Sequence, residues 1–130
     1  MVTVTEQKLR VVEGMLSYWR DNPSRWVQRT LGYPDSGLCL MGNLFYNSDM
    51  VSRYPGSWNK TTPLAEAVMN DLEEAIYNLA FTRSIPDYND YECHTVSQAA
   101  LPVVALRDRY RRELEPELVA ISEHEYRLID

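Results

Sequence analysis

Long apolar runs are missing from this chain of 130 residues. No segment approaches the roughly 20 consecutive apolar residues that a membrane-spanning helix requires. The Val2-Thr3-Val4 start also lacks the basic and apolar regions of a signal peptide. We therefore expect a soluble cytoplasmic protein that makes no contact with membranes.

Cysteine and histidine are scarce, with two of each. Cys39 and Cys93 are too few for a disulfide framework, and we expect them to be free thiols in a reducing compartment. A disulfide between them stays open, because pairing depends on a geometry that a sequence does not contain. Cys93 and His94 are adjacent and His124 is distant, but no zinc-type spacing joins these residues. The sequence predicts no metal and no other cofactor.

Catalytic signatures are also missing. The chain has no phosphate-binding glycine-rich loop, no G-x-S-x-G, no H-E-x-x-H and no kinase motif. Its formal net charge is −6 and its isoelectric point is near 4.9, so the molecule as a whole repels nucleic acid. These absences favour a non-enzymatic protein for which nucleic acid is an unlikely partner.

Helix-capping signals are present at three places. Thr3 with Glu6, and Thr95 with Gln98, have the spacing of a capping box, and Thr62-Pro63 combines an N-cap residue with proline at the first helical position. Apolar residues recur at steps of three and four behind each signal. This pattern predicts three helices, each with one buried face.

The region between the helix that begins near Thr3 and the helix that begins near Thr62 is less regular. Asn22-Pro23 is expected to begin a short second helix that Gly32 closes. Residues 33–38 have the composition of a turn, and the almost wholly apolar residues 39–46 predict a buried central helix or, alternatively, a buried strand. Residues 47–62 are expected to form a long surface loop.

Two prolines interrupt the C-terminal region. Pro102 is expected to kink or divide the last helix and Pro116 to end it, which leaves residues 116–130 as a short helix or tail. No segment shows sustained alternation of polar and apolar residues. The sequence therefore predicts one all-α domain over residues 1–130, with four to six helices and a core at about 3–115.

One group of polar residues is the candidate polar cluster: Trp26, Gln28, Cys39, Asn89 and Asp90. One interpretation is a small enzyme or ligand-binding domain with a pocket near these side chains. The other is structural, because Asn and Asp cap helices and bond nearby backbone, and buried polar side chains can form a hydrogen-bonded cluster that fixes the fold. The sequence leaves both interpretations of the cluster open.

Cys39 and Gly42 lie one helical turn apart. Two small residues at this spacing let a neighbouring helix approach closely. A nucleophilic cysteine would need a lowered thiol pKa, whereas the apolar surroundings argue for a raised one. Packing is therefore the favoured role.

A candidate basic patch consists of four arginines: Arg107, Arg109, Arg111 and Arg112. These could grip a phosphate backbone, which makes nucleic-acid binding a weak alternative function. Helical spacing also allows Asp108 to pair with Arg112, and Arg111 with Glu115. We expect a salt-bridged, solvated helix face.

A candidate interaction surface consists of aromatic residues in or beside predicted loops: Tyr54, Trp58, Tyr88 and Tyr91. Tyrosine and tryptophan are enriched among the residues that dominate binding energy at protein interfaces. They also fill gaps over a small core. The sequence leaves both roles open.

Three short motifs, taken in order, resemble a family of small uncharacterised proteins of actinobacteria and their phages, a domain of unknown function. The family pattern is W-x-Q, then C-x-x-G-x-L, then S-I-x-x-W-N-D. The matching residues are Trp26, Gln28, Cys39, Gly42, Leu44, Ser84, Ile85, Tyr88, Asn89 and Asp90. Tyr88 stands where the family has Trp. The resemblance implies an actinobacterial or phage setting and no particular reaction.

The expected function is a non-enzymatic protein–protein interaction module, such as a phage-encoded accessory factor that acts on a host protein. The partner would be a host protein or a second copy of this chain. The alternatives are the ligand-binding domain and, more weakly, the nucleic-acid-binding protein described above.

Overall fold

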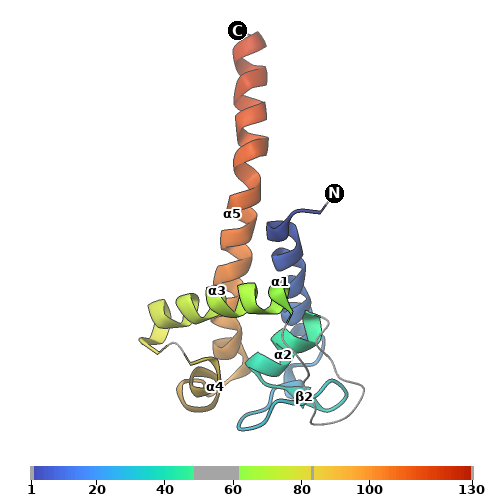
Figure 1. Ribbon diagram of the computed structural model, residues 1–130, viewed down its shortest axis with the longest axis vertical. Coiled ribbons are helices and arrows are strands. Elements are labelled where there is room, and N and C mark those ends of the chain that lie inside the picture. Colours follow the sequence, from blue (N-terminus) through green and yellow to red (C-terminus); the bar gives the residue numbers. More distant parts are fainter. Residues whose placement is uncertain (1, 49–61, 83, 130) are drawn as a thin grey trace.

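The computed structural model describes residues 2–48, 62–82 and 84–129, with side chains up to Glu115. Helices dominate, which confirms the predicted all-α class, and α1 and α5 lie side by side while α3 crosses them (Figure 1). The five α-helices of the described residues are α1 (Val4–Asp21), α2 (Leu40–Asn47), α3 (Pro63–Ala80), α4 (Ile85–Asp87) and α5 (Val96–Ile129).

Short elements connect these helices. A 3-10 turn (Pro23–Arg25) follows α1, and a two-stranded antiparallel hairpin of β1 (Gly32–Tyr33) and β2 (Gly37–Leu38) precedes α2. The hairpin confirms the predicted turn at residues 33–38. A single π-helical turn (Tyr88–Glu92) continues α4.

The predicted caps are confirmed at all three helix starts. The Thr3 hydroxyl accepts a hydrogen bond of 3.1 Å from the Glu6 backbone N–H, and Thr62 caps α3 in the same way. At α5, Thr95 and Gln98 bond each other's backbone N–H reciprocally, at 3.2 Å each. These bonds satisfy backbone donors that a helix start would otherwise leave without partners.

One continuous core joins α1, α2, α3, α4 and α5. Within the described residues its fully buried members include Val12, Met15, Leu40, Leu44, Val68, Leu72, Ile76, Val103, Leu106 and Tyr110. Residues 39–46, for which the sequence left helix and strand open, are helical: Cys39 caps α2, and residues 40–46 make up all of that helix except its last residue. No helix of the described residues combines the length and apolarity needed to cross a membrane.

The predicted second helix after Asn22-Pro23 is wrong. Only the 3-10 turn forms, and Trp26 is already extended, with φ −104° and ψ 130°. Trp26 pairs with Leu38 in an isolated bridge, and the Val27 N–H reaches the Leu38 carbonyl at 3.4 Å. Pairing with a distant segment has overridden local helix signals.

The predictions that Pro102 divides the last helix and that Pro116 ends it are also wrong, because α5 runs unbroken from Val96 to Ile129. Pro102 has no N–H for the carbonyl of Gln98, one turn earlier. The Tyr88 hydroxyl supplies the missing donor, at 2.7 Å. Past Pro116, α5 extends away from the rest of the molecule (Figure 1).

Candidate functional site

Asn89 is buried in the π-helical turn and bonds four partners. Its side-chain oxygen accepts from the Trp26 indole N–H at 2.7 Å and from the Leu40 backbone N–H at 3.1 Å. Its amide nitrogen donates to the Val27 carbonyl at 3.0 Å and to the Asp90 carboxylate at 2.9 Å. Both oxygen lone pairs and both amide hydrogens are thus used.

Gln28 closes the same assembly from the other side. Its amide nitrogen lies within 2.9–3.2 Å of the carbonyl oxygens of Asn89, Asp90 and Cys93, at the end of the helical turn where carbonyls lack partners along the chain. The Asp90 carboxylate accepts from the Arg29 backbone N–H at 2.8 Å. We call Trp26, Gln28, Leu40, Asn89 and Asp90 the Asn89 network.

Cys39, the remaining member of the candidate polar cluster, lies beside this network at the N-cap of α2. Its sulfur accepts from the Gly42 backbone N–H at 3.3 Å, and burial raises the pKa of the thiol. A β-carbon at Gly42 would clash with the Leu31 carbonyl oxygen. Gly42 therefore allows a close approach, as the sequence predicted, but the neighbour is the backbone of Leu31 just before β1 and not a helix. The raised pKa makes the Cys39 thiol a poor nucleophile. Both Cys39 and Cys93 are free, as expected.

The structure brings the candidate polar cluster together, but its polar groups face one another and the backbone. Among the described residues, no buried side-chain nitrogen or oxygen lacks a hydrogen-bond partner. A ligand site needs polar groups that converge on a cavity instead. This geometry favours the structural interpretation.

A second polar network, which the sequence did not predict, centres on Asp71 of α3. Its carboxylate accepts from the Tyr110 hydroxyl at 2.6 Å and from the Lys8 ammonium at 2.9 Å, while Arg109 lies 3.7 Å away. Burial acts to raise the pKa of Asp71, but the bonds from Tyr110 and Lys8 and the nearby cations outweigh it and hold the pKa below its ordinary value. We call these four residues the Asp71 network. It ties α1, α3 and α5 together.

One signal for this network is present in the sequence. Lys8 precedes Val11 and Val12 by one helical turn, and Asp71 follows Val68 by one turn. Each charged residue thus belongs to a buried helix face, where charge is rare unless it is paired. The sequence thus predicts that Lys8 and Asp71 each need a partner, but only the helix packing shows that they pair with each other.

The candidate basic patch is largely neutralised by carboxylates. Arg109 pairs with Glu113 at 3.0 Å within α5, and Arg111 pairs with Glu13 of α1 at 3.3 Å. The pair with Glu13 replaces the expected pair of Arg111 with Glu115, because α1 brings the Glu13 carboxylate close. The expected pair of Asp108 with Arg112 is not found among the described residues either. Arg107 pairs with its neighbour Asp108. Three of the four arginines thus belong to a salt-bridged helix face, as expected, while Arg112 is exposed and has no ion pair with a described residue.

The candidate interaction surface is only partly described. Tyr54 and Trp58 lie outside the described residues. The inclusion of Tyr88 was wrong, because its ring is buried and its hydroxyl completes α5. Tyr91 is 67% exposed.

Phe81, which was not among the predicted site residues, is 83% exposed and directly follows α3. Its φ of 58° places it in the left-handed region. Its ring meets that of Tyr77 edge to face, with centroids 6.1 Å apart. Glycine usually occupies this position at the end of a helix, because a side chain there costs about 1 kcal/mol. The signal in the sequence for this exposed residue was a phenylalanine at a helix end where glycine is expected.

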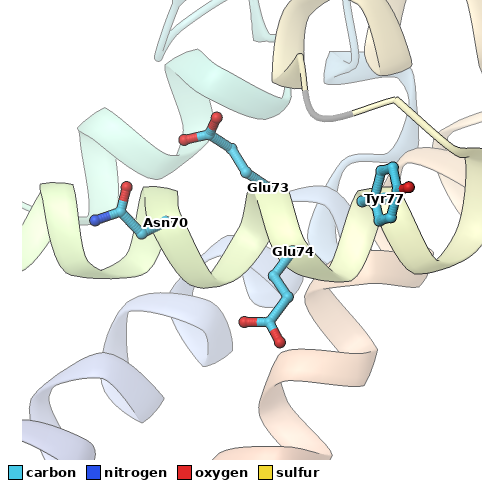
Figure 2. Close-up of a pocket in the computed structure, with 4 residues that line it drawn as sticks. All are labelled: Asn70, Glu73, Glu74 and Tyr77. Atoms are coloured by element: carbon cyan, nitrogen blue, oxygen red, sulfur yellow. The ribbon is translucent and has the colours of Figure 1, made fainter.

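We call the side of α3 that carries Asn70, Glu73, Glu74 and Tyr77 its outer face, and the aromatic pair lies at its C-terminal end. The outer face carries a hollow of about 410 Å³ lined by Asn70, Glu73, Glu74 and Tyr77. Glu73 and Glu74 leave the helix on opposite sides of the face (Figure 2). Within the described residues, no three His, Cys, Asp or Glu side chains are grouped to hold a metal ion.

The chain matches no protein-family model, no curated protein and no solved structure.

Proposed function

We propose that this protein is a non-catalytic interaction module that binds another protein through the C-terminal end of α3, where Tyr77 and Phe81 form an aromatic pair. The observation that carries the proposal is Phe81 itself. It is the most exposed large apolar residue described, and it sits in a backbone conformation that favours glycine. A strained, exposed aromatic side chain is a feature of binding surfaces.

Energetics support the same assignment. Burying a phenylalanine side chain stabilises a complex by about 1.5–3 kcal/mol relative to leaving it in water. The fold gains little from Phe81, because the ring covers almost no core. Tyr77 supports the ring from the preceding helical turn. The benefit of an aromatic residue here would therefore arise in a complex.

The alternative functions receive less support. The Asn89 network uses its polar groups within the fold, which disfavours the ligand-binding domain. Three arginines of the candidate basic patch, Arg107, Arg109 and Arg111, are paired with carboxylates and the net charge is −6, which disfavours nucleic acid. The resemblance to actinobacterial and phage proteins suggests a host protein as the partner.

Affinity capture from an actinobacterial lysate tests this proposal. We compare the wild-type protein with Phe81→Ser and with Leu101→Ser, which removes another exposed apolar side chain, 52% exposed, from α5. A protein that is retained by wild type and by Leu101→Ser, but lost with Phe81→Ser, supports the proposal. Equal capture by all three variants contradicts it.

A further inference from the structure

We infer that the partner presents a basic segment, containing arginine or lysine, that lies along the outer face of α3 and ends on the ring of Phe81. This inference rests on the proposed function and specifies the chemistry of the partner. Three features support it: the negative charge of α3, the partial negative charge at the C-terminus of that helix, and the aromatic pair.

The charge of α3 is entirely negative. Its sequence, PLAEAVMNDLEEAIYNLA, contains four carboxylates and no basic residue. Lys8 and Tyr110 already occupy Asp71. Glu73 has no ion pair with a described residue, and Glu74 approaches Arg109 only at 3.7 Å with its own side chain 68% exposed. Such a long, exposed pair is weak, so both glutamates are available to a cation from outside.

The end of α3 adds to this negative potential. The C-terminus of a helix carries a partial negative charge, which basic side chains in the last turn usually offset. The last turn of α3 has no basic residue. Glu73 and Glu74 lie in the same half of the helix and increase the imbalance. A cation supplied by a partner would relieve it.

The aromatic pair favours the same kind of ligand. Guanidinium and ammonium groups bind over aromatic faces, and arginine does so most often. Tyr77 and Phe81 follow Glu73 and Glu74 along one face at helical spacing. The two carboxylates, followed by the exposed ring of Phe81, therefore form a surface for a basic chain.

The hollow sets the size of the segment. Its lining runs from Asn70 to Tyr77, a distance of about 10 Å along the helix at a rise of 1.5 Å per residue. About three residues of extended chain span that length. Glu73 and Glu74, which leave the helix on opposite sides (Figure 2), would flank such a chain.

A defined peptide tests the inference. The probe is an eight-residue peptide of alternating arginine and alanine. It is titrated into ¹⁵N-labelled protein while the chemical shifts of the backbone amides are followed. The control is the same peptide with glutamate in place of arginine. We expect saturable shifts in residues 70–81 with the arginine peptide alone. Glu73→Gln with Glu74→Gln should weaken binding about fivefold, the loss expected for two exposed ion pairs.

The matched control is Glu92→Gln with Glu115→Gln, two exposed carboxylates outside α3 whose loss changes the net charge by the same amount. Weakening by less than about twofold there, at fixed salt, would assign the effect to α3 rather than to overall charge. Shifts centred elsewhere, or equal weakening by both pairs, would overturn the inference. A captured partner that requires Phe81 but tolerates the Glu73 and Glu74 changes would overturn it while leaving the proposed function intact.

Discussion

The indole N–H of Trp26 donates a 2.7 Å hydrogen bond to the side-chain oxygen of Asn89, 63 residues further along the chain. This bond fastens the extended segment after α1 to the π-helical turn before α5. The Leu40 N–H meets the same oxygen, so the start of α2 is held there as well. One buried amide thus sets how three segments meet.

Replacing Asn89 with alanine should destabilise the fold by about 2–4 kcal/mol, because two donors and a carbonyl lose their partner in a buried site. Urea unfolding measures the change. Asn78→Ala removes an exposed amide from α3 and should change stability by less than about 0.5 kcal/mol. Equal effects at the two positions would show that the Asn89 network contributes little.

The bond from the Tyr88 hydroxyl to the Gln98 carbonyl predicts coupling between Tyr88 and Pro102. Tyr88→Phe should cost about 1–2 kcal/mol, because the Gln98 carbonyl loses its donor. In a Pro102→Ala background, the new N–H at position 102 can bond that carbonyl, so the same change should cost under about 0.5 kcal/mol. A double-mutant cycle by urea unfolding measures the difference. If the two substitutions had additive effects on stability, the Tyr88 hydroxyl would not be replacing the backbone N–H that Pro102 lacks.

The lowered pKa of Asp71 predicts a pH dependence. A carboxyl whose pKa is lower in the folded state adds stability above its unfolded pKa, near 3.8, and loses that contribution as pH falls through the folded pKa. Asp71→Asn should therefore cost about 1–3 kcal/mol at pH 7, with Lys8 left without its carboxylate, and less at pH 2–3. Urea unfolding at both pH values measures this. Asp21→Asn, an exposed control, should have little effect at either. A pH-independent cost at position 71 would contradict the account.

Phe81→Gly should stabilise the protein by about 1 kcal/mol, because glycine adopts the left-handed conformation without strain. Phe81→Ala removes the ring but keeps the strain, so it should bring no such gain. Thermal unfolding compares the two variants, and both should lose the captured partner. Stabilisation by glycine together with loss of binding would show that the residue serves binding at the expense of stability. No stabilisation would mean that the backbone is not strained there.

The sequence predicted the features that depend on near neighbours. The caps at Thr3, Thr62 and Thr95 each involve groups three residues apart, so their spacing is visible in the sequence. The apolar character of residues 39–46 likewise reports burial directly. These local signals were sufficient for the all-α class.

Features that depend on distant contacts were missed. Pro102 stays within α5 because Tyr88 of a different element supplies a donor, and Trp26 is extended because Leu38 pairs with it. The candidate polar cluster was predicted as a group. That its polar groups bond one another and the backbone was not predictable, because it depends on the π-helical turn that holds Asn89. Lys8 and Asp71 meet only because α1 and α3 cross.

Site-specific photocrosslinking tests the central claim most directly. A benzophenone amino acid replaces Phe81 in one variant and Tyr33, an exposed aromatic of the hairpin, in the other. Both are irradiated in an actinobacterial lysate, and the adducts are identified by mass spectrometry. We predict one protein adduct at position 81, crosslinked through a basic segment of that protein, and no adduct with the same protein at position 33. The same adducts at both positions, or none at position 81, would contradict the claim that the end of α3 is a binding surface.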